Sequence, residues 1–430
     1  MQQEHVPPPT AAPLTKEKAT ELAAMFKQEL ESVVQFWIQH SPDREHGGFF
    51  TCLERDGSVY DKDKFVWLQN REIWLMSELY NHYEKRPVFL EMATLGANFM
   101  KEHGRAESGD WYFALNQQGR PLVAPYNIFS DCFACMAFSA YANATQQQWA
   151  REIAAEAYSH ILARQENPKG KWSKGVPGTR PSRALALPMI LVNLCMELTS
   201  HLTECHVPGD EQVAQRFGLS PAQTQAKIAS LLEMLFRDFV DPQSHLMHEH
   251  IMQTPEDQDT YDGRLVNPGH TLETCWFTVE AAKTLEGPEY AAVRSRAIEQ
   301  ACELALNTLR FGWDSQNGGI FYFMDMKGHS PQQLEWDQKL WWVHVEALIA
   351  CIVCFRETRR PVFWDWYQRI HQYTFSHFPD PQGGGEWFGY LNREGRPLLS
   401  AKGGKWKGCF HVPRGMFRLA NIFSDFAKSL

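Results

Sequence analysis

The chain alternates between amphipathic and mostly apolar helical patterns, which are separated by turn-rich segments. Residues 14–39 carry apolar side chains at helical spacing and begin near Thr15, a residue type favoured at helix N-termini. A polar segment with an aspartate and a Gly-Gly pair follows, and a far more apolar helical pattern then begins near Trp67. This order predicts two helices joined by a short glycine-containing loop.

The same helix-loop-helix unit recurs six times, so the repeat determines how each segment is interpreted. The loops lie at residues 41–57, 108–119, 167–175, 240–252, 313–328 and 379–395. The more apolar helices after them are predicted to begin near Trp67, Phe129, Arg183, His270, Trp341 and His411, and the amphipathic helices before them near Leu14, Val88, Gln146, Ala222, Glu289 and Pro361.

Six such pairs, with the apolar helices inside, predict an all-α (α/α)6 barrel with short β-hairpin loops at the pocket end. An open α-solenoid is the alternative, but glycine and aromatic motifs at each inner-helix start favour a closed ring around one pocket. We expect residues 1–13 to be a disordered leader and residues 14–430 to be one catalytic domain. Residues 203–220 contain extra sequence, and Pro208–Ser220 is expected to be an exposed insertion.

Charge and composition narrow the class of function. The net charge of -9 is spread along the chain without a basic block, which disfavours nucleic acid and anionic membranes as partners. No apolar run has the length of a membrane span and no signal peptide is evident, so we expect a cytoplasmic protein. The ten cysteines fall mostly in apolar patterns and are expected to be buried thiols. The high aromatic content suits a sugar-binding pocket.

Polar residues at the starts of the apolar helices are the candidates for chemistry, because these positions are otherwise apolar. Arg71 shares a helix face with Trp67. His270 follows Pro-Gly, and Glu273 comes one turn later on the same side. Arg71 and His270 each have a structural alternative. Arg71 could form an ion pair with Glu72, and His270 could cap its own helix.

The last two apolar helices carry further candidates. Glu346 shares a face with Trp342, whereas His344 points nearly the opposite way, so Glu346 is expected to face the pocket. His411 opens the final helix behind a loop that contains Trp406. Glu346 could instead balance a nearby cation and His411 could be a core or capping residue. Two histidines, two carboxylates and an arginine converging on one cavity nevertheless favour catalysis over stability.

Two other clusters point to different chemistry. His245, His248 and His250 lie in a strand-like loop without obvious partner ligands, so we predict no metal site there. The segment KGGKWKG lacks the spacing and the hydroxyl of a phosphate-binding loop. Its Lys405 and Lys407 could still receive a nucleotide or another anion.

Several strings in order are similar to those of the N-acyl-D-glucosamine 2-epimerases, known in animals as renin-binding protein. They are GGFFTCLERDG, WLQNREIW, NPGHTLE, LEWDQKLWWVHVE, EWFGYLNREG and KGGKWKGCFHVPR. The resemblance implies an (α/α)6 barrel, usually a homodimer, that interconverts N-acetyl-D-glucosamine and N-acetyl-D-mannosamine. It also implies chemistry without metal or cofactor, and activation by ATP or another nucleotide that is not consumed.

The resemblance assigns roles to the candidate residues. It implies that His270 and His411 are the acid/base pair and that Arg71 and Glu346 are functionally critical. Related cellobiose 2-epimerases imply that Glu273, Trp342 and Trp406 belong to the pocket. The chemistry fits, because inversion at C2 removes a proton from one face and returns one to the other, and histidine works as acid or base near neutrality. Arg71 is expected to stabilise the enediolate oxygen.

Three alternatives remain open at this point. An aldose-ketose isomerase, or a cellobiose-type 2-epimerase, would use the same enediolate on the same barrel. A glycoside hydrolase would use paired carboxylates such as Glu335, Asp337 or Glu346, although the two histidines argue against it. An interaction protein that binds renin is the non-enzymatic alternative.

Overall fold

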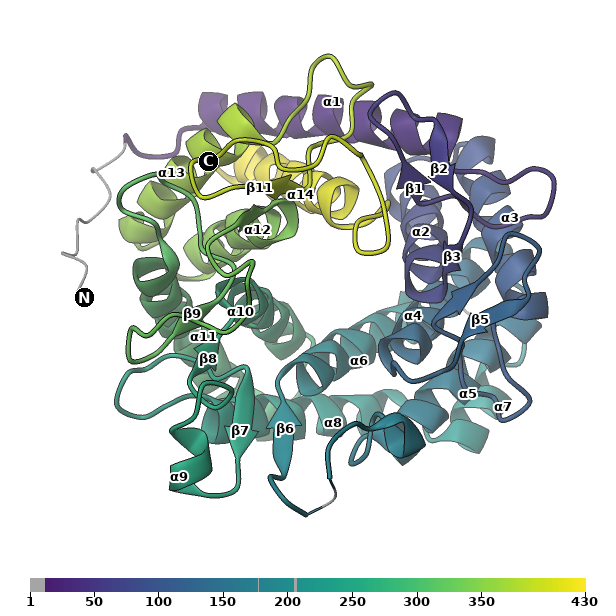
Figure 1. The fold of residues 1–430 in the computed structure, drawn as a ribbon, viewed down its shortest axis with the longest axis horizontal. Helices are drawn as coiled ribbons and strands as arrows, with labels where there is room; N and C mark the ends of the chain where they lie inside the picture. Colours follow the sequence, from purple (N-terminus) through teal and green to yellow (C-terminus); the bar gives the residue numbers. More distant parts are fainter. Residues whose placement is uncertain (1–11, 177, 205–206) are drawn as a thin grey trace.

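Fourteen α-helices dominate the computed structural model, which describes residues 12–176, 178–204 and 207–430. Twelve of them form an outer and an inner ring around a central opening (Figure 1). The outer ring consists of α1 (Lys16–His40), α3 (Pro87–His103), α5 (Gln148–Arg164), α8 (Pro221–Met234), α11 (Ala291–Gly312) and α13 (Pro361–His377). The inner ring consists of α2 (Val66–Glu78), α4 (Phe129–Thr145), α6 (Ala186–Glu204), α10 (Pro268–Lys283), α12 (Trp341–Thr358) and α14 (His411–Ser429).

Hydrophobic patterning explains which helix lies in which ring. Helix α12 is buried at every position from Trp341 to Cys354, as its apolar sequence requires. Helix α1 instead buries one face, with Leu22, Phe26 and Leu30 at helical spacing. The predicted (α/α)6 barrel and the predicted starts of its helices are therefore confirmed to within a few residues.

The first and last helices close the ring. The rings of Phe26 in α1 and Phe423 in α14 stack with their centroids 5.7 Å apart. Trp37, near the end of α1, donates its indole N–H to the buried carboxylate of Glu386. Closure therefore joins residues from opposite ends of the chain and completes a pocket that an open solenoid would not enclose.

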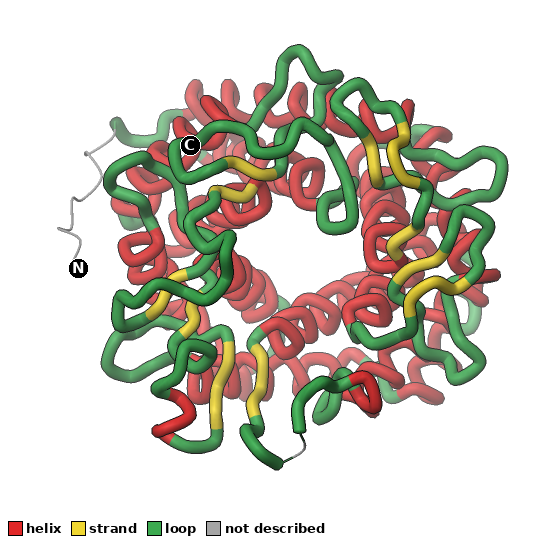
Figure 2. Tube along the Cα trace, viewed as in Figure 1, coloured by secondary structure: helices red, strands yellow, loops and turns green. Residues whose placement is uncertain are grey.

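Short strands run around one end of the barrel (Figure 2). They are β1 (Cys52–Leu53), β2 (Val59–Asp61), β3 (Lys64–Phe65), β4 (Ala114–Leu115), β5 (Pro121–Val123), β6 (Ser182–Ala184), β7 (His250–Met252), β8 (Leu265–Val266), β9 (Met324–Asp325), β10 (Lys339–Leu340) and β11 (Tyr390–Leu391). Among the named strands, local β-hairpins form at β1–β2 and β4–β5, and single antiparallel bridges such as Val240–Met247 and Trp313–Ile320 close the turns of other loops. The pairs β3–β4, β6–β7, β8–β9 and β10–β11 join different loops, because such short strands need partners to satisfy their backbone groups.

The repeated aspartate of the loops has a structural role. In three loops this aspartate is buried, and its carboxylate accepts hydrogen bonds from backbone N–H groups two or three residues further on. In each of these loops it also forms an ion pair with a buried lysine. The pairs are Asp43 with Lys64, Asp314 with Lys339, and Asp380 with Lys402. Each pair ties a turn to a later part of the rim, so the loops are held in fixed positions.

Residues 208–220 are not wholly exposed, which corrects the predicted insertion. They contain α7 (Asp210–Phe217), and Asp210 accepts a 2.8 Å hydrogen bond from the buried Arg151 on α5. Val213 and Leu219 are also buried, so this segment packs on the outer ring. A second short helix, α9 (Pro255–Gln258), lies in a rim loop.

The structure describes only the end of the predicted leader, residues 1–13. Residues 1–11 of the predicted leader lie outside the described residues, whereas the Ala12 carbonyl accepts a hydrogen bond from Trp364.

Among the described helices, none is both long and apolar enough to cross a bilayer. The cysteines in the described ranges are buried free thiols, as their apolar surroundings predict.

The Lys64–Asp43 pair provides a test of the rim. Both side chains are buried, and Lys64 also donates to the carbonyls of Gly47 and Gln117. Lys64→Met leaves the Asp43 carboxylate buried without its counter-ion, so we expect a loss of about 3–5 kcal/mol in the free energy of unfolding, measured by urea denaturation. The double variant Asp43→Asn/Lys64→Met should recover part of this loss. A Lys64→Met variant as stable as the parent would contradict the proposed role.

Candidate active site

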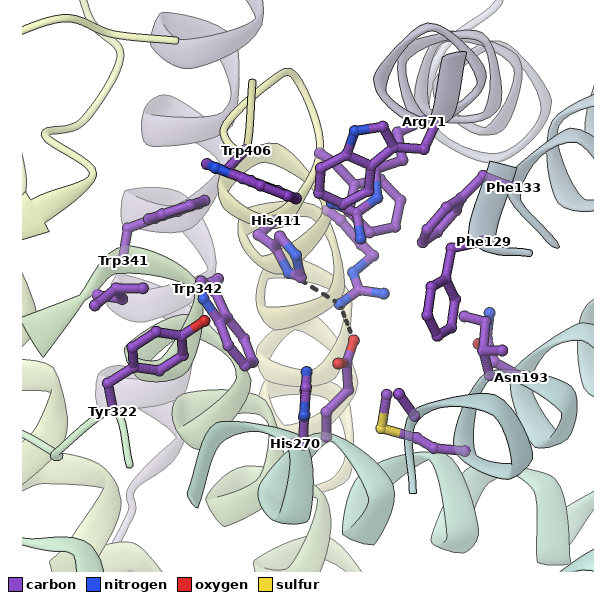
Figure 3. Close-up of a pocket in the computed structure, with 18 of the residues that line it drawn as sticks. Arg71, Phe129, Phe133, Asn193, His270, Tyr322, Trp341, Trp342, Trp406 and His411 are labelled. Carbon is purple, nitrogen blue, oxygen red and sulfur yellow. Dashed lines mark hydrogen bonds and ion pairs between the residues drawn. The ribbon is translucent and has the colours of Figure 1, made fainter. Parts of the chain in front are cut away.

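A cavity of about 610 Å³ opens at the rim end of the barrel. Its walls come from the beginnings of the inner helices and from the loops above them (Figures 1 and 3). This volume lies within the range typical of small-molecule sites. The sequence-predicted residues Arg71, His270, Glu273, Trp342, Trp406 and His411 all line it.

His270 is positioned by the N-terminus of α10. Asn267 caps this helix, with its side-chain oxygen accepting the His270 backbone N–H at 3.0 Å. The His270 ring does not cap the helix; its Nδ1 lies 3.0 Å from both carboxylate oxygens of Glu249. Burial opposes protonation, but the charge and hydrogen bond of Glu249 outweigh it and raise the pKa of His270 above its ordinary value.

Glu249 is a site residue that the sequence analysis missed. It lies between His248 and His250, which drew attention as possible metal ligands. In an extended segment successive side chains alternate in direction, and His248 donates Nδ1–H to the Gly263 carbonyl while Glu249 reaches His270. The alternation with His248 was the signal that could have revealed Glu249.

His411 is the first residue of α14 and is nine-tenths buried. Its Nδ1 lies 2.8 Å from the carboxylate of Glu346, which also accepts the indole N–H of Trp276. Burial, reinforced by the positive charges of Arg71 and Arg414, holds the pKa of His411 well below its ordinary value. A neutral His411 that donates Nδ1–H to Glu346 has a free lone pair on Nε2.

Arg414, one turn after His411, was also missed. Its guanidinium donates to Glu273 on α10 at 2.8 Å and to Glu346 on α12 at 2.5 Å. It thereby joins three inner helices at the base of the pocket. The spacing to His411 places both side chains on one face of α14, which could have indicated the role of Arg414.

Arg71 offers an uncommitted positive charge to the cavity. Its guanidinium carbon lies 4.3 Å from the ring centre of Trp67, 4.1 Å from that of Phe133 and 4.6 Å from that of Phe410. Within the described chain it forms no hydrogen bond, and Glu72 instead accepts one from Ser41. Burial lowers the pKa of Arg71 to about 9, so the group remains cationic near neutrality.

Aromatic rings enclose the two histidines. The Trp342 ring centre lies 5.2 Å from that of His270 and 5.7 Å from that of His411. Figure 3 shows Trp341, Trp342 and Tyr322 together on one side of the cavity. Trp406, half exposed, contributes to the mouth and contacts the ring of Trp67. The pocket therefore offers flat apolar surfaces beside its charged groups.

The contacts of His344 and Glu346 show where these two predicted residues lie. His344 donates to the Leu340 carbonyl and accepts from the Ile320 N–H, and burial lowers its pKa to about 3. It faces away from the pocket, as expected. The prediction that Glu346 faces the pocket is corrected: it is fully buried and does not line the cavity. It balances the cation of Arg414, as the structural alternative held, and contacts the pocket residue His411.

The predicted anion loop is corrected at Lys407. Lys407 is buried and donates to Glu386 at 2.7 Å, so its charge is already neutralised. Lys405 is exposed, with its ammonium 5.0 Å from the ring centre of Trp406. Only Lys405 of the two is accessible to an anion.

Metal binding fits the donor groups poorly. Glu273, Glu346 and His411 bring ligand atoms within 4.8 Å of one another. The Arg414 guanidinium, however, is hydrogen-bonded to both carboxylates, so a cation already occupies the place of a metal. Within the described ranges, His245, His248 and His250 do not form such a group.

The charges of the site balance in one protonation state. Arg71, Arg414 and a protonated His270 supply three positive charges, and Glu249, Glu273 and Glu346 supply three negative charges. With His411 neutral, the buried cluster carries no net charge, which limits the cost of desolvation. The raised pKa of His270 favours it as the proton donor, and the lowered pKa of His411 favours it as the acceptor.

Known proteins match nearly the whole chain. A family model described as N-acylglucosamine 2-epimerase (GlcNAc 2-epimerase) matches residues 48–412. The chain is 37% identical over 423 residues to an N-acylglucosamine 2-epimerase of Rattus norvegicus, with 96% of each chain covered.

Solved structures show the same fold at lower identity. A cellobiose 2-epimerase from Spirochaeta thermophila DSM 6192 has a TM-score of 0.77 at 20% identity, covering 96% of this chain and 100% of that one. A D-mannose isomerase has a TM-score of 0.71 at 18% identity, with the same coverage. These two likenesses concern the fold alone.

The Glu249–His270 pair predicts the response of one pKa to substitution. Glu249→Gln removes the charge that stabilises the imidazolium and leaves the burial that opposes it, so the pKa of His270 should fall below about 6.5. An NMR titration of the His270 ring protons measures this directly. Glu335→Gln, which alters a pocket carboxylate that does not contact His270, serves as the control. An unchanged His270 pKa in Glu249→Gln would refute the coupling.

Proposed function

Since the chain belongs to the N-acylglucosamine 2-epimerase family and is therefore an isomerase, a carbohydrate 2-epimerase, we propose that it interconverts N-acetyl-D-glucosamine and N-acetyl-D-mannosamine. The observation that supports the reaction best is the pair of histidines with pKa values shifted in opposite directions. Epimerisation needs one base and one acid at the same carbon, and these opposite shifts favour His411 as the base and His270 as the acid.

The mechanism we propose starts from the open-chain sugar, whose aldehyde acidifies the C2 proton. His411 accepts this proton on Nε2, because its Nδ1–H is donated to Glu346. The electron pair of the C2–H bond forms an enolate, which carries nitrogen on C2, and Arg71 stabilises its C1 oxygen. His270 then returns a proton to the opposite face of C2, and in the reverse direction the two histidines exchange roles.

Supporting residues hold these groups in place. Glu249 and Glu346 orient the imidazoles through their Nδ1 atoms, and Arg414 fixes Glu346. Trp342 lies beside both rings, where it limits the access of water to the enolate. Every group named acts without a metal or cofactor, as the family resemblance implies.

Several properties stay predictions drawn from the family resemblance. They are activation by ATP or another nucleotide and formation of a homodimer. A cytoplasmic location stays a prediction from the sequence itself, and a renin-binding interaction protein stays the non-enzymatic alternative. For the nucleotide, Lys405 is the remaining candidate of the predicted anion loop.

Proton exchange at C2 tests the reaction. Incubation with N-acetyl-D-mannosamine in deuterated water should replace the C2 hydrogen by deuterium during epimerisation, because the proton passes through a titratable side chain. Proton NMR follows both the exchange and the new epimer. Complete retention of the original hydrogen would contradict the enolate route. A preference for converting D-mannose into its ketose would favour the isomerase alternative.

The histidines can be tested one at a time. His270→Asn and His411→Asn should each reduce epimerisation about 10²- to 10⁴-fold, the usual size of a general acid/base contribution. Each variant should still exchange the C2 proton of one epimer, because abstraction needs one base and inversion needs both. Thermal melts establish that the variants fold. Near-normal epimerisation by either folded variant would refute the two-histidine mechanism.

A further inference from the structure

The residues of α4 and α6 that line the pocket are apolar except for a single amide. On α6 the lining residues recur at helical spacing, and on α4 two phenylalanines lie one turn apart. We call this surface the α4–α6 wall; it consists of Phe129, Phe133, Ala186, Met189, Ile190 and Asn193. Figure 3 shows Phe129, Phe133 and Asn193 together on the side opposite Trp341 and Trp342.

Asn193 has an unused hydrogen-bond acceptor. The side chain is 2% exposed, and its Nδ2 donates to the Met136 sulfur at 3.3 Å, a weak acceptor that orients the amide. Its Oδ1 is buried and accepts no hydrogen bond from any residue that the structure describes. Buried polar atoms are nearly always paired, so an unpaired oxygen in an apolar wall indicates that a ligand supplies the donor.

The wall lies beside the reacting groups. The Arg71 guanidinium is 4.1 Å from the centre of the Phe133 ring. His270 and His411 lie between this wall and the aromatic side in Figure 3. A substituent on C2 is bonded to the reacting carbon, so it must occupy space next to these groups.

The opposite side of the pocket suits the rest of the sugar. It offers Glu335 and Gln338 together with the hydroxyls of Tyr322 and Tyr390, all of which line the cavity. These groups can pair with the hydroxyls of C3 to C6. A chain of hydroxyls would lose its hydration against the α4–α6 wall without recovering it, whereas an apolar substituent would gain from burial there.

We propose that the α4–α6 wall binds the N-acyl group on C2 and that Asn193 determines the preference for acylated amino sugars. An acylamino group combines an N–H donor with an apolar acyl chain. Asn193 Oδ1 accepts that N–H, and the methyl group packs on Met189, Ile190 and Phe129. This assignment rests on the proposed function, because it places C2 between the two histidines.

Binding of unreactive alditols tests the assignment without catalysis. Wild-type protein should bind N-acetyl-D-mannosaminitol more tightly than D-mannitol, as measured by calorimetry. Asn193→Leu, which keeps the size but removes the acceptor, should weaken binding of the acylated alditol about tenfold or more and leave D-mannitol unaffected. Asn193→Asp, which keeps an oxygen at this place, should retain more of the acylated binding than Asn193→Leu.

The matched control is Gln338→Leu, which removes an amide from the opposite side and should weaken both alditols alike. Melting temperatures should show that Asn193→Leu folds, since it removes an unpaired buried acceptor, and Asn193→Asp provides a second variant. Equal effects of Asn193→Leu on both alditols, or no effect on either, would overturn the proposal. The protein could also show no C2 exchange while its preference for the acylated alditol still depends on Asn193. That result would support the subsite and overturn the epimerase function.

Discussion

The active site depends on one guanidinium that holds two buried carboxylates together. Glu273 and Glu346 come from different helices, and burying two carboxylates side by side is costly without a counter-ion. Arg414 supplies it from α14, the helix whose first residue is His411. The same interaction therefore closes the base of the pocket, fixes Glu346 and sets the position of His411.

The surroundings of this cluster shift the pKa values of two chemically identical side chains in opposite directions. Both imidazoles contact a carboxylate, but burial together with the charges of Arg71 and Arg414 lowers the pKa of His411, whereas Glu249 raises that of His270 against its burial. A reaction that adds and removes protons at one carbon benefits from this asymmetry, because one imidazole is favoured as the donor and the other as the acceptor. Arg71 completes the arrangement by leaving its charge free for the oxygen on which negative charge develops.

The barrel itself does not specify this reaction, since a D-mannose isomerase shares its shape. Its contribution is mechanical. Ladders between successive loops and three buried aspartate-lysine pairs hold the rim, so the helix N-termini that carry the histidines are supported from above. Function then depends on which side chains stand at the starts of the inner helices and on the walls between them.

The sequence by itself determined the fold and the residues whose signals are local. Periodicity separated inner from outer helices, and the repeat located the helix starts that carry Arg71, His270 and His411. Only the tertiary structure decided the partners: Glu249 for His270, Arg414 for two carboxylates, and Glu386 for Lys407. The physical reason is that helical spacing reports the direction of a side chain from its own axis, whereas contacts between residues distant in sequence exist only once the ring has closed.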